Sequence, residues 1–189
     1  MVYFFDEKAV LISAIIYILI LGLLKYFSQK NFVFYIFFTL MYLYINLVLK
    51  YTQFPIYNDE FQRSIWGPFS LEKNFILIPF KNIVNSSSLY NIILTVPFGF
   101  LLPFICRMNL LKLLLAGIGF SGILELLQAL AGILAGYSTR VIDINDLICN
   151  TAGAAAGYGL FLSLYMAVRK ISEKKASVNF LFTYIIERK

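Results

Sequence analysis

The sequence predicts an all-α fold, a polytopic integral membrane helical bundle that forms a single membrane domain over residues 1–189. Hydrophobic residues make up 60% of the chain and charged residues 14%, whereas soluble domains are about 45–50% apolar and about 25% charged. The apolar residues form long continuous runs, and these differ from the short alternating segments of a membrane β-barrel. The chain has no histidine, which excludes a Ser-His-Asp triad and a zinc site with imidazole ligands.

Five runs are long enough to cross a bilayer, because a hydrocarbon core about 30 Å thick needs roughly 20 mostly apolar residues in a helix. The first run, about residues 9–24, ends at Lys25. An acidic segment precedes it and no small-residue cleavage site follows it, so we expect a signal anchor and not a cleaved signal peptide. The second run, about residues 32–49, ends at Lys50.

The third run, about residues 89–106, contains Pro97 and Pro103. A proline inside a helix frees a backbone carbonyl and bends the helix, and neighbouring helices can satisfy that carbonyl in a membrane. The fourth run, about residues 110–134, is interrupted by one glutamate, and the fifth, about residues 147–168, ends at two basic residues. The prediction is therefore about five transmembrane helices.

Lysine and arginine residues in the connecting loops predict the orientation, because they are enriched on the cytoplasmic side. With five spans the termini lie on opposite sides, and the basic residues divide into six on the N-terminal side and ten on the other. The N-terminus is therefore expected outside and the C-terminus in the cytoplasm, with residues 169–189 as a basic cytoplasmic tail. The net charge of +6 is explained by this topology and by contact with anionic lipid, and nucleic-acid binding is not predicted. The six basic residues on the N-terminal side are Lys8, Lys50, Arg63, Lys73, Lys81 and Arg140. The ten on the C-terminal side are Lys25, Lys30, Arg107, Lys112, Arg169, Lys170, Lys174, Lys175, Arg188 and Lys189.

Two shorter apolar segments lie outside the predicted spans. The run Phe75–Phe80, in the long outer connection, is too short to cross the bilayer and is expected either to re-enter the bundle or to lie at the membrane interface. The run Val178–Ile186, near the C-terminus, has basic flanks and is expected to form an interfacial helix on the inner leaflet.

Polar side chains inside the fourth span predict a functional face, because polar groups in hydrocarbon are costly and are commonly retained for function. Gly117, Ser121, Glu125, Gln128 and Gly132 follow one another at steps of four, four, three and four. That spacing places them on one side of a helix.

The fifth span carries a similar face, formed by Asp143, Asp146, Asn150, Gly153 and Gly157. Its two glycines form a small-xxx-small pair that allows another backbone to approach closely. The simplest arrangement has this face packed against the polar face of the fourth span.

The predicted topology places most of these polar groups in the outer half of the membrane. Asn91 opens the third span from the same side, and Arg140 is near enough to pair with Asp143. Three acids against one arginine leave two negative charges in excess, so the cluster is expected to hold a proton, a divalent cation or a cationic ligand group. The alternative is structural: Asp143 and Asp146 would cap the helix, and Asn150 and Gln128 would make interhelical hydrogen bonds.

Four stretches of the sequence occur in an order that is typical of one bacterial family. They are Asn74–Phe80 (NFILIPF), Asn91–Gly99 (NIILTVPFG), Glu125–Gln128 (ELLQ) and Arg140–Gly153 (RVIDINDLICNTAG). Together they resemble the VanZ-like family of bacterial membrane proteins, with a core at about residues 71–160. The family name comes from a protein associated with low-level resistance to teicoplanin, and the resemblance assigns no catalytic role to any residue.

The resemblance implies a multi-pass protein of the bacterial plasma membrane and cell envelope, with a link to glycopeptide (teicoplanin) resistance as an expectation. From the residues, the main hypothesis is binding of a lipid-linked or cell-wall-related ligand at the outward-facing polar cluster. The alternatives are an integral membrane enzyme acting on a polyprenyl or lipid phosphate, a small transporter, and a structural subunit. No cofactor is predicted, apart from the divalent cation considered above. The candidate site residues are Asn74, Asn91, Glu125, Gln128, Arg140, Asp143, Asp146 and Asn150.

Overall fold

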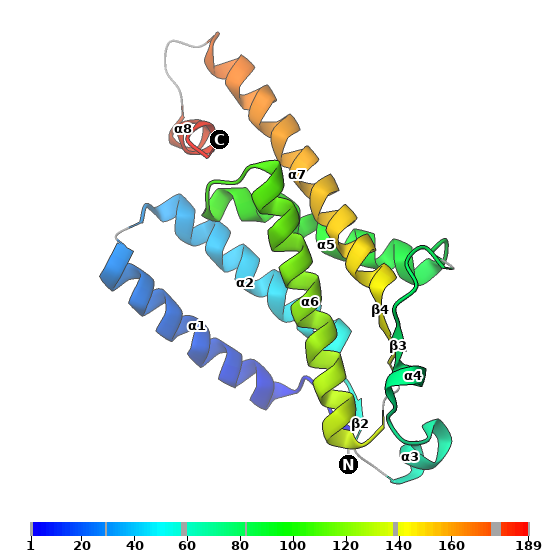
Figure 1. Ribbon diagram of the computed structural model, residues 1–189. Coiled ribbons are helices and arrows are strands. Elements are labelled where there is room, and N and C mark those ends of the chain that lie inside the picture. The colour runs from blue at the N-terminus through cyan, green and yellow to red at the C-terminus, as the bar shows by residue number, and fades with distance from the viewer. Residues whose placement is uncertain are drawn as a thin grey trace.

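The structure is a computed structural model that describes residues 2–28, 30–57, 60–81, 83–137, 140–174 and 179–188. Within these residues the chain is mainly helical, with four strands of two residues each (Figure 1). The helices are α1 (Glu7–Ser28), α2 (Phe32–Gln53), α3 (Glu60–Trp66), α4 (Leu71–Asn74), α5 (Ser86–Ile105), α6 (Leu110–Ala135), α7 (Ile144–Ser172) and α8 (Phe180–Ile186). The strands are β1 (Val2–Tyr3), β2 (Ile56–Tyr57), β3 (Phe75–Ile76) and β4 (Ile142–Asp143).

Five helices, α1, α2, α5, α6 and α7, are long and apolar enough to cross a membrane, which confirms the five predicted spans. Each of the last four begins at a polar side chain that accepts a hydrogen bond from a backbone N–H of the first turn. Such caps satisfy N–H groups that have no partner inside the helix. The caps lie outside the apolar runs, so several of the helices are longer than those runs. The four capping residues are Asn31, Asn85, Asn109 and Asp143.

The helix α7 packs along α5 and α6, and α2 packs against the side formed by α5 and α6 (Figure 1). The helix α1 lies at the periphery beyond α2 and has no buried residue. A short polar seam joins α1 to α2: Ser13 Oγ lies 2.8 Å from Tyr42 Oη and donates to Asn46 Oδ1 at 2.5 Å, and Tyr17 Oη lies 2.5 Å from Thr39 Oγ1. Most of α1 therefore presents apolar side chains outward, as a lipid-facing helix does.

The closest helix contact is between α5 and α7, which run parallel. A Cβ atom on Gly157 would lie 2.0 Å from the carbonyl oxygen of Val96, and one on Gly153 would lie 2.2 Å from that of Ile92. The expectation that these two glycines pack against the fourth span is therefore wrong. They face the third span instead, because Gly99 allows that helix to approach just as closely.

The polar part of the predicted contact between α6 and α7 is present. Asn150 Nδ2 donates to Ser121 Oγ at 2.8 Å, and both residues are buried. The hydroxyl of Thr95, on α5, donates to the Asn150 carbonyl oxygen at 2.7 Å. These bonds join the three central helices at one depth of the bundle.

Two strand pairs connect segments that are far apart in sequence. The parallel pair β3–β4 places Phe75 beside Ile142, and the antiparallel pair β1–β2 places Val2 beside Tyr57. After Phe75 the chain runs over the surface and not into the bundle, and residues 76–80 are exposed. The re-entrant alternative for Phe75–Phe80 is therefore wrong, because pairing with β4 holds the segment at the end of the helices.

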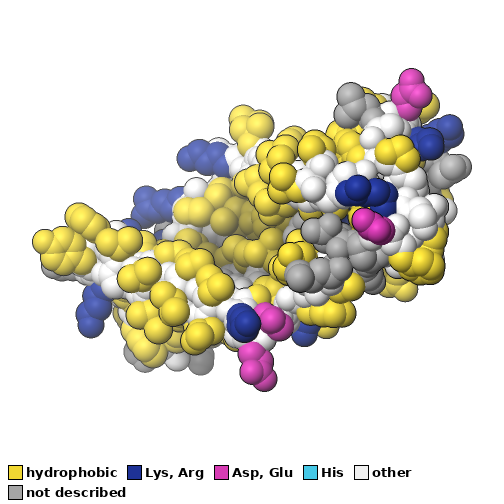
Figure 2. Space-filling view, turned by 90° about the horizontal axis from the view of Figure 1, so that it is seen from below, with side chains coloured by type: hydrophobic (Ala, Val, Ile, Leu, Met, Phe, Trp, Pro, Cys, Tyr) yellow, Lys and Arg dark blue, Asp and Glu magenta, His cyan; other side chains and the backbone are white. Residues whose placement is uncertain are grey.

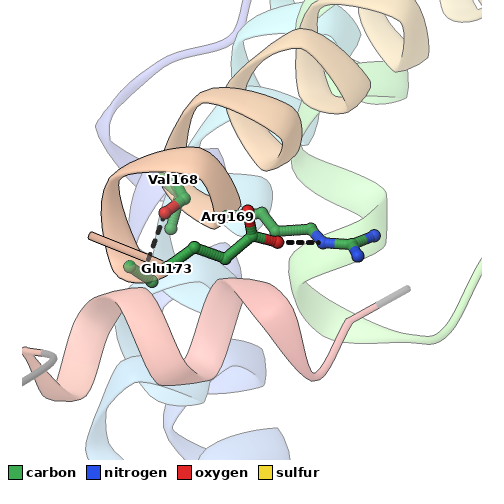
Figure 3. A network of polar contacts seen from close by, with 4 residues as sticks. Val168, Arg169 and Glu173 are labelled. Carbon is green, nitrogen blue, oxygen red and sulfur yellow. Dashed lines mark hydrogen bonds and ion pairs between the residues drawn. The ribbon is translucent and has the colours of Figure 1, made fainter. Parts of the chain in front are cut away.

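The helix α8 packs against the opposite end of the bundle, near the end of α7. Tyr184 is 1% exposed, its hydroxyl donates to the Phe104 carbonyl oxygen at 2.5 Å, and its ring lies parallel to that of Phe37. At the end of α7, Arg169 and Glu173 form an exposed ion pair at 3.0 Å (Figure 3). The helix that the sequence predicted near the C-terminus is thus present as α8, and its face with Tyr184 and Ile185 packs against the rest of the bundle.

The two groups of loops that the topology assigns to opposite sides lie at opposite ends of the bundle. We refer to the end with α3, β3 and β4 as the pocket end, and to the other as the α8 end. Which end faces the cytoplasm stays a prediction. Lys175 and Lys189 of the predicted basic tail lie outside the described residues.

Candidate functional site

A pocket of about 410 Å³ lies at the pocket end of the bundle. Four of the predicted site residues line it, namely Asn91, Gln128, Arg140 and Asp146. We call it the polar pocket. Its lining residues are Tyr51 and Thr52 of α2, Ser87, Tyr90, Asn91 and Leu94 of α5, Gln128 of α6, Arg140 and Val141, which directly precede β4, and Asp146 of α7.

Asn91 and Asp146 meet because α5 and α7 are parallel and in close contact. Asn91 lies near the start of α5 and Asp146 lies in the first turn of α7. The Asn91 side chain lies near enough to the Asp146 carboxylate to interact favourably with it. The glycine contacts farther along α7 keep the two helices in this register, so the pair depends on backbone packing several turns away.

Gln128 and Arg140 have a structural role in addition to lining the pocket. Gln128 Nε2 donates to the Thr52 carbonyl oxygen at 3.2 Å, and Arg140 Nη2 donates to that of Phe54 at 3.3 Å. The last carbonyl groups of a helix have no partner inside it. These two side chains therefore hold the end of α2 against the rest of the site.

Glu125 is buried one turn before Gln128 and does not line the polar pocket. Its carboxylate interacts electrostatically with Asp146, Asp143 and Arg140, and it lies near the backbone of Asp143. Its Oε2 atom has no hydrogen-bond partner among the described residues. The three predicted acids thus lie within electrostatic range of one another, with Glu125 behind the pocket.

This acidic cluster does not have the geometry of a metal centre. In the part of the chain that the structure describes, no three Asp, Glu or Cys side chains gather to hold a metal ion. The acids are distributed over the pocket wall, a helix cap and the buried interior.

The capping alternative is confirmed for Asp143. The interhelical alternative is confirmed for Gln128, by its bond to Thr52 of α2, and for Asn150. Asp143 precedes α7, and its Oδ1 accepts a hydrogen bond from the Asn145 backbone N–H at 2.8 Å. Asn150 makes the bond to Ser121 described above. Neither the Asp143 side chain nor the Asn150 side chain lines the polar pocket.

Asn74 is also a structural residue. It is buried, its Oδ1 accepts from the Ser70 backbone N–H at 3.1 Å, and its Nδ2 lies 3.4 Å from the Arg140 carbonyl oxygen that accepts its hydrogen bond. It therefore fastens the loop before β3 to the segment that carries Arg140, and it affects the pocket only through that residue.

The sequence prediction missed several residues that matter at this end. Tyr51, Tyr90 and Ser87 line the pocket, but tyrosine and serine at the ends of predicted spans are too common here to stand out. Asn145 is 2% exposed, and its Oδ1 accepts from the Phe80 backbone N–H at 2.7 Å while its Nδ2 donates to a neighbouring carbonyl. The signal available in the sequence was its position directly before Asp146, a predicted site residue.

Most of the chain matches the model of one protein family. The family model described as VanZ/LLP1 matches residues 9–167. The match includes every residue that lines the polar pocket, the whole of α2, α5 and α6, and α1 and α7 apart from the first two residues of α1 and the last five of α7. The match is wider than the resemblance at residues 71–160 and leaves out α8. Comparison with curated proteins and with solved structures gives no match.

Proposed function

Because the chain belongs to the VanZ/LLP1 family, we propose that this membrane protein binds a lipid-linked, cell-wall-related ligand in the polar pocket, in the bacterial plasma membrane. One observation carries the proposal: Asn91, Arg140 and Asp146, from three separate segments, converge on one pocket at the end of lipid-facing helices. Such a pocket offers a positive charge, a carboxylate and an amide to a polar headgroup.

The surroundings of the pocket favour a ligand that carries a lipid chain. Tyr51 and Tyr90 line the pocket and are also largely exposed. On α5, Leu89 and Ile93 flank Tyr90 and are exposed on the surface that lipid covers. A headgroup bound to Asp146 could therefore keep its hydrocarbon chain on this apolar surface, while Arg140 supplies positive charge for a phosphate.

Asp146→Asn is expected to weaken binding of a polyprenyl-linked peptidoglycan precursor by about tenfold or more, since hydrogen bonds to a charged group contribute about 1.5–3 kcal/mol. Asp143→Asn is the matched control. It removes one negative charge nearby, but asparagine caps a helix as well as aspartate does, so binding should stay within about twofold of the wild type. Binding is measured on protein in nanodiscs by native mass spectrometry or calorimetry.

Two results would contradict the proposal. One is a wild-type protein that binds the precursor no better than an ordinary phospholipid. The other is equal binding by the Asp146 and Asp143 variants, which would show that the pocket side chain does not contact the ligand.

The proposal includes a link to teicoplanin, because a protein that holds a cell-wall precursor would alter the access of this glycopeptide to its target. Expression of the wild-type chain in a susceptible bacterium is expected to raise the inhibitory concentration of teicoplanin, and expression of the Asp146→Asn variant at the same level is not. An unchanged inhibitory concentration with the wild type would remove the link to resistance and leave ligand binding to be judged by the nanodisc measurement.

A further inference from the structure

We propose that two apolar patches outside the five spans anchor the pocket end in the headgroup region of the bilayer. Each of their side chains is between 53% and 70% exposed, although none belongs to a membrane-spanning helix. The proposal does not depend on which ligand enters the polar pocket. The α3 patch consists of Phe61, Ile65 and Trp66, and the loop patch consists of Leu77, Ile78 and Phe80.

The α3 patch is held directly on the end of a span. Arg63 Nη2 donates to the carbonyl oxygen of Ala135, the last residue of α6, at 2.6 Å. At 100° per residue, Arg63 lies on the opposite side of α3 from Phe61 and Ile65. The polar headgroup region extends roughly 5–8 Å beyond the hydrocarbon core on each side, so a helix fastened to the end of α6 lies within it.

The loop patch is held in the same way at the start of another span. Asn145, the second residue of α7, accepts from the Phe80 backbone N–H at 2.7 Å and donates to the Lys81 carbonyl oxygen at 3.1 Å. Asn145 is buried. The backbone of the loop is therefore fixed at the membrane boundary, while the side chain of Phe80 points away from the protein core.

The backbone at Phe80 is the least expected feature of this loop. Its φ is 63°, in the left-handed region that bulky residues seldom adopt and that glycine adopts at little cost. The Phe80 side chain is 68% exposed, so packing within the protein does not explain its presence. Strained backbone of this kind is commonly retained for function, and an aromatic ring at the lipid interface is such a function.

The surface continues into the lipid-facing surface of α6, where Ile133 and Leu134 are exposed next to the residue that binds Arg63. Aromatic residues are enriched where headgroups meet hydrocarbon. The indole N–H of Trp66 donates to Gln62 Oε1 at 3.1 Å, so its polar group has a partner. Figure 2, seen from below in Figure 1 and so from the side where α3 lies, shows hydrophobic side chains over much of this face with basic and acidic side chains interspersed among them, as a headgroup region accommodates. A bilayer is therefore the occupant that this surface fits.

The chain contains one tryptophan, so Trp66 reports the position of α3 without any substitution. In the wild-type protein reconstituted into phospholipid vesicles, its fluorescence should be quenched by lipids brominated near the headgroup end of the acyl chain. Quenching by lipids brominated near the methyl end should be weaker by roughly twofold, since tryptophan at an interface stays near the headgroups. Acrylamide in the water should quench it weakly.

Two single-tryptophan variants in a Trp66→Phe background make the comparison sharper. Phe80→Trp should show the same lipid quenching as Trp66. Glu60→Trp, at an exposed position that 100° per residue places about 100–140° around α3 from each patch residue, should be quenched by acrylamide and little by brominated lipid. Equal size-exclusion profiles confirm that each variant folds as the wild type does.

The proposal is overturned if Trp66 and the Glu60→Trp reporter are equally accessible to acrylamide and equally insensitive to brominated lipid. It is also overturned if Trp66 is protected from acrylamide, insensitive to brominated lipid and dependent on the ratio of protein to lipid, because that result shows contact with a second copy of the chain.

Discussion

Gly157→Ala is expected to destabilise the bundle by about 3 kcal/mol or more, at the upper end of the range for overpacked interiors. The added Cβ would lie 2.0 Å from the Val96 carbonyl oxygen and 2.8 Å from the Phe100 backbone nitrogen. Both atoms belong to the backbone of α5, so no side-chain rotation relieves the clash. The two helices must separate, and the Asn91–Asp146 pair in the polar pocket must separate with them.

Gly159→Ala is the matched control, two residues farther along α7. A Cβ on Gly159 meets nothing within 4 Å, and alanine favours a helix over glycine by about 1 kcal/mol. Its stability should therefore equal or exceed that of the wild type. Thermal unfolding in one detergent, followed by the loss of the monodisperse size-exclusion peak, compares the two variants. Equal unfolding temperatures for the two alanine variants would show that α5 and α7 are not in backbone contact.

Tyr184→Ala is expected to release α8 from the bundle, because removal of a fully buried aromatic ring costs about 3–5 kcal/mol. The ring is 1% exposed, it lies parallel to the Phe37 ring, and the guanidinium Cζ of Arg188 is 4.2 Å from its centroid. Release should appear as faster amide hydrogen exchange throughout α8, with exchange in α5 and α7 largely unchanged.

Tyr184→Phe keeps the ring and removes only the hydrogen bond to Phe104, so it should cost about 1 kcal/mol. Thr183→Ala, at an exposed position of the same helix, should change stability by less than about 0.5 kcal/mol. If α8 exchanges at the wild-type rate in Tyr184→Ala, then the packing of this helix does not depend on Tyr184.

The sequence predicted which residues contribute to the candidate site better than it predicted how they are arranged. Asn91, Gln128 and Arg140 line the pocket together with Asp146, as polar residues near one end of the predicted spans. Asp143 and Asn150 share a predicted helix face with Asp146, yet one caps the helix and the other bonds to Ser121. Spacing places residues on a face of one helix, but it does not say which neighbouring helix covers each part of that face.

Asn145 illustrates the same limit at a position that no periodic pattern includes. It is among the most buried polar residues and connects α7 to the loop at Phe80. Its partners are backbone groups more than sixty positions away in the chain. Sequence spacing contains no information about a contact of that kind, since any buried amide can serve a backbone N–H wherever folding brings the two together.

Hydrophobicity and helix capping depend on residues close together in the chain, so the sequence alone is sufficient to predict five spanning helices and the ends at which their polar residues lie. Pairing between helices depends on distant backbone contacts, and the structure places Gly153 and Gly157 against α5, where sequence spacing favoured the fourth span. That choice follows from Gly99, because only a helix that also lacks a side chain at the crossing can come so close. The same contact brings Asn91 to Asp146, and so it was tertiary packing that made a pocket from residues the sequence had marked only as polar.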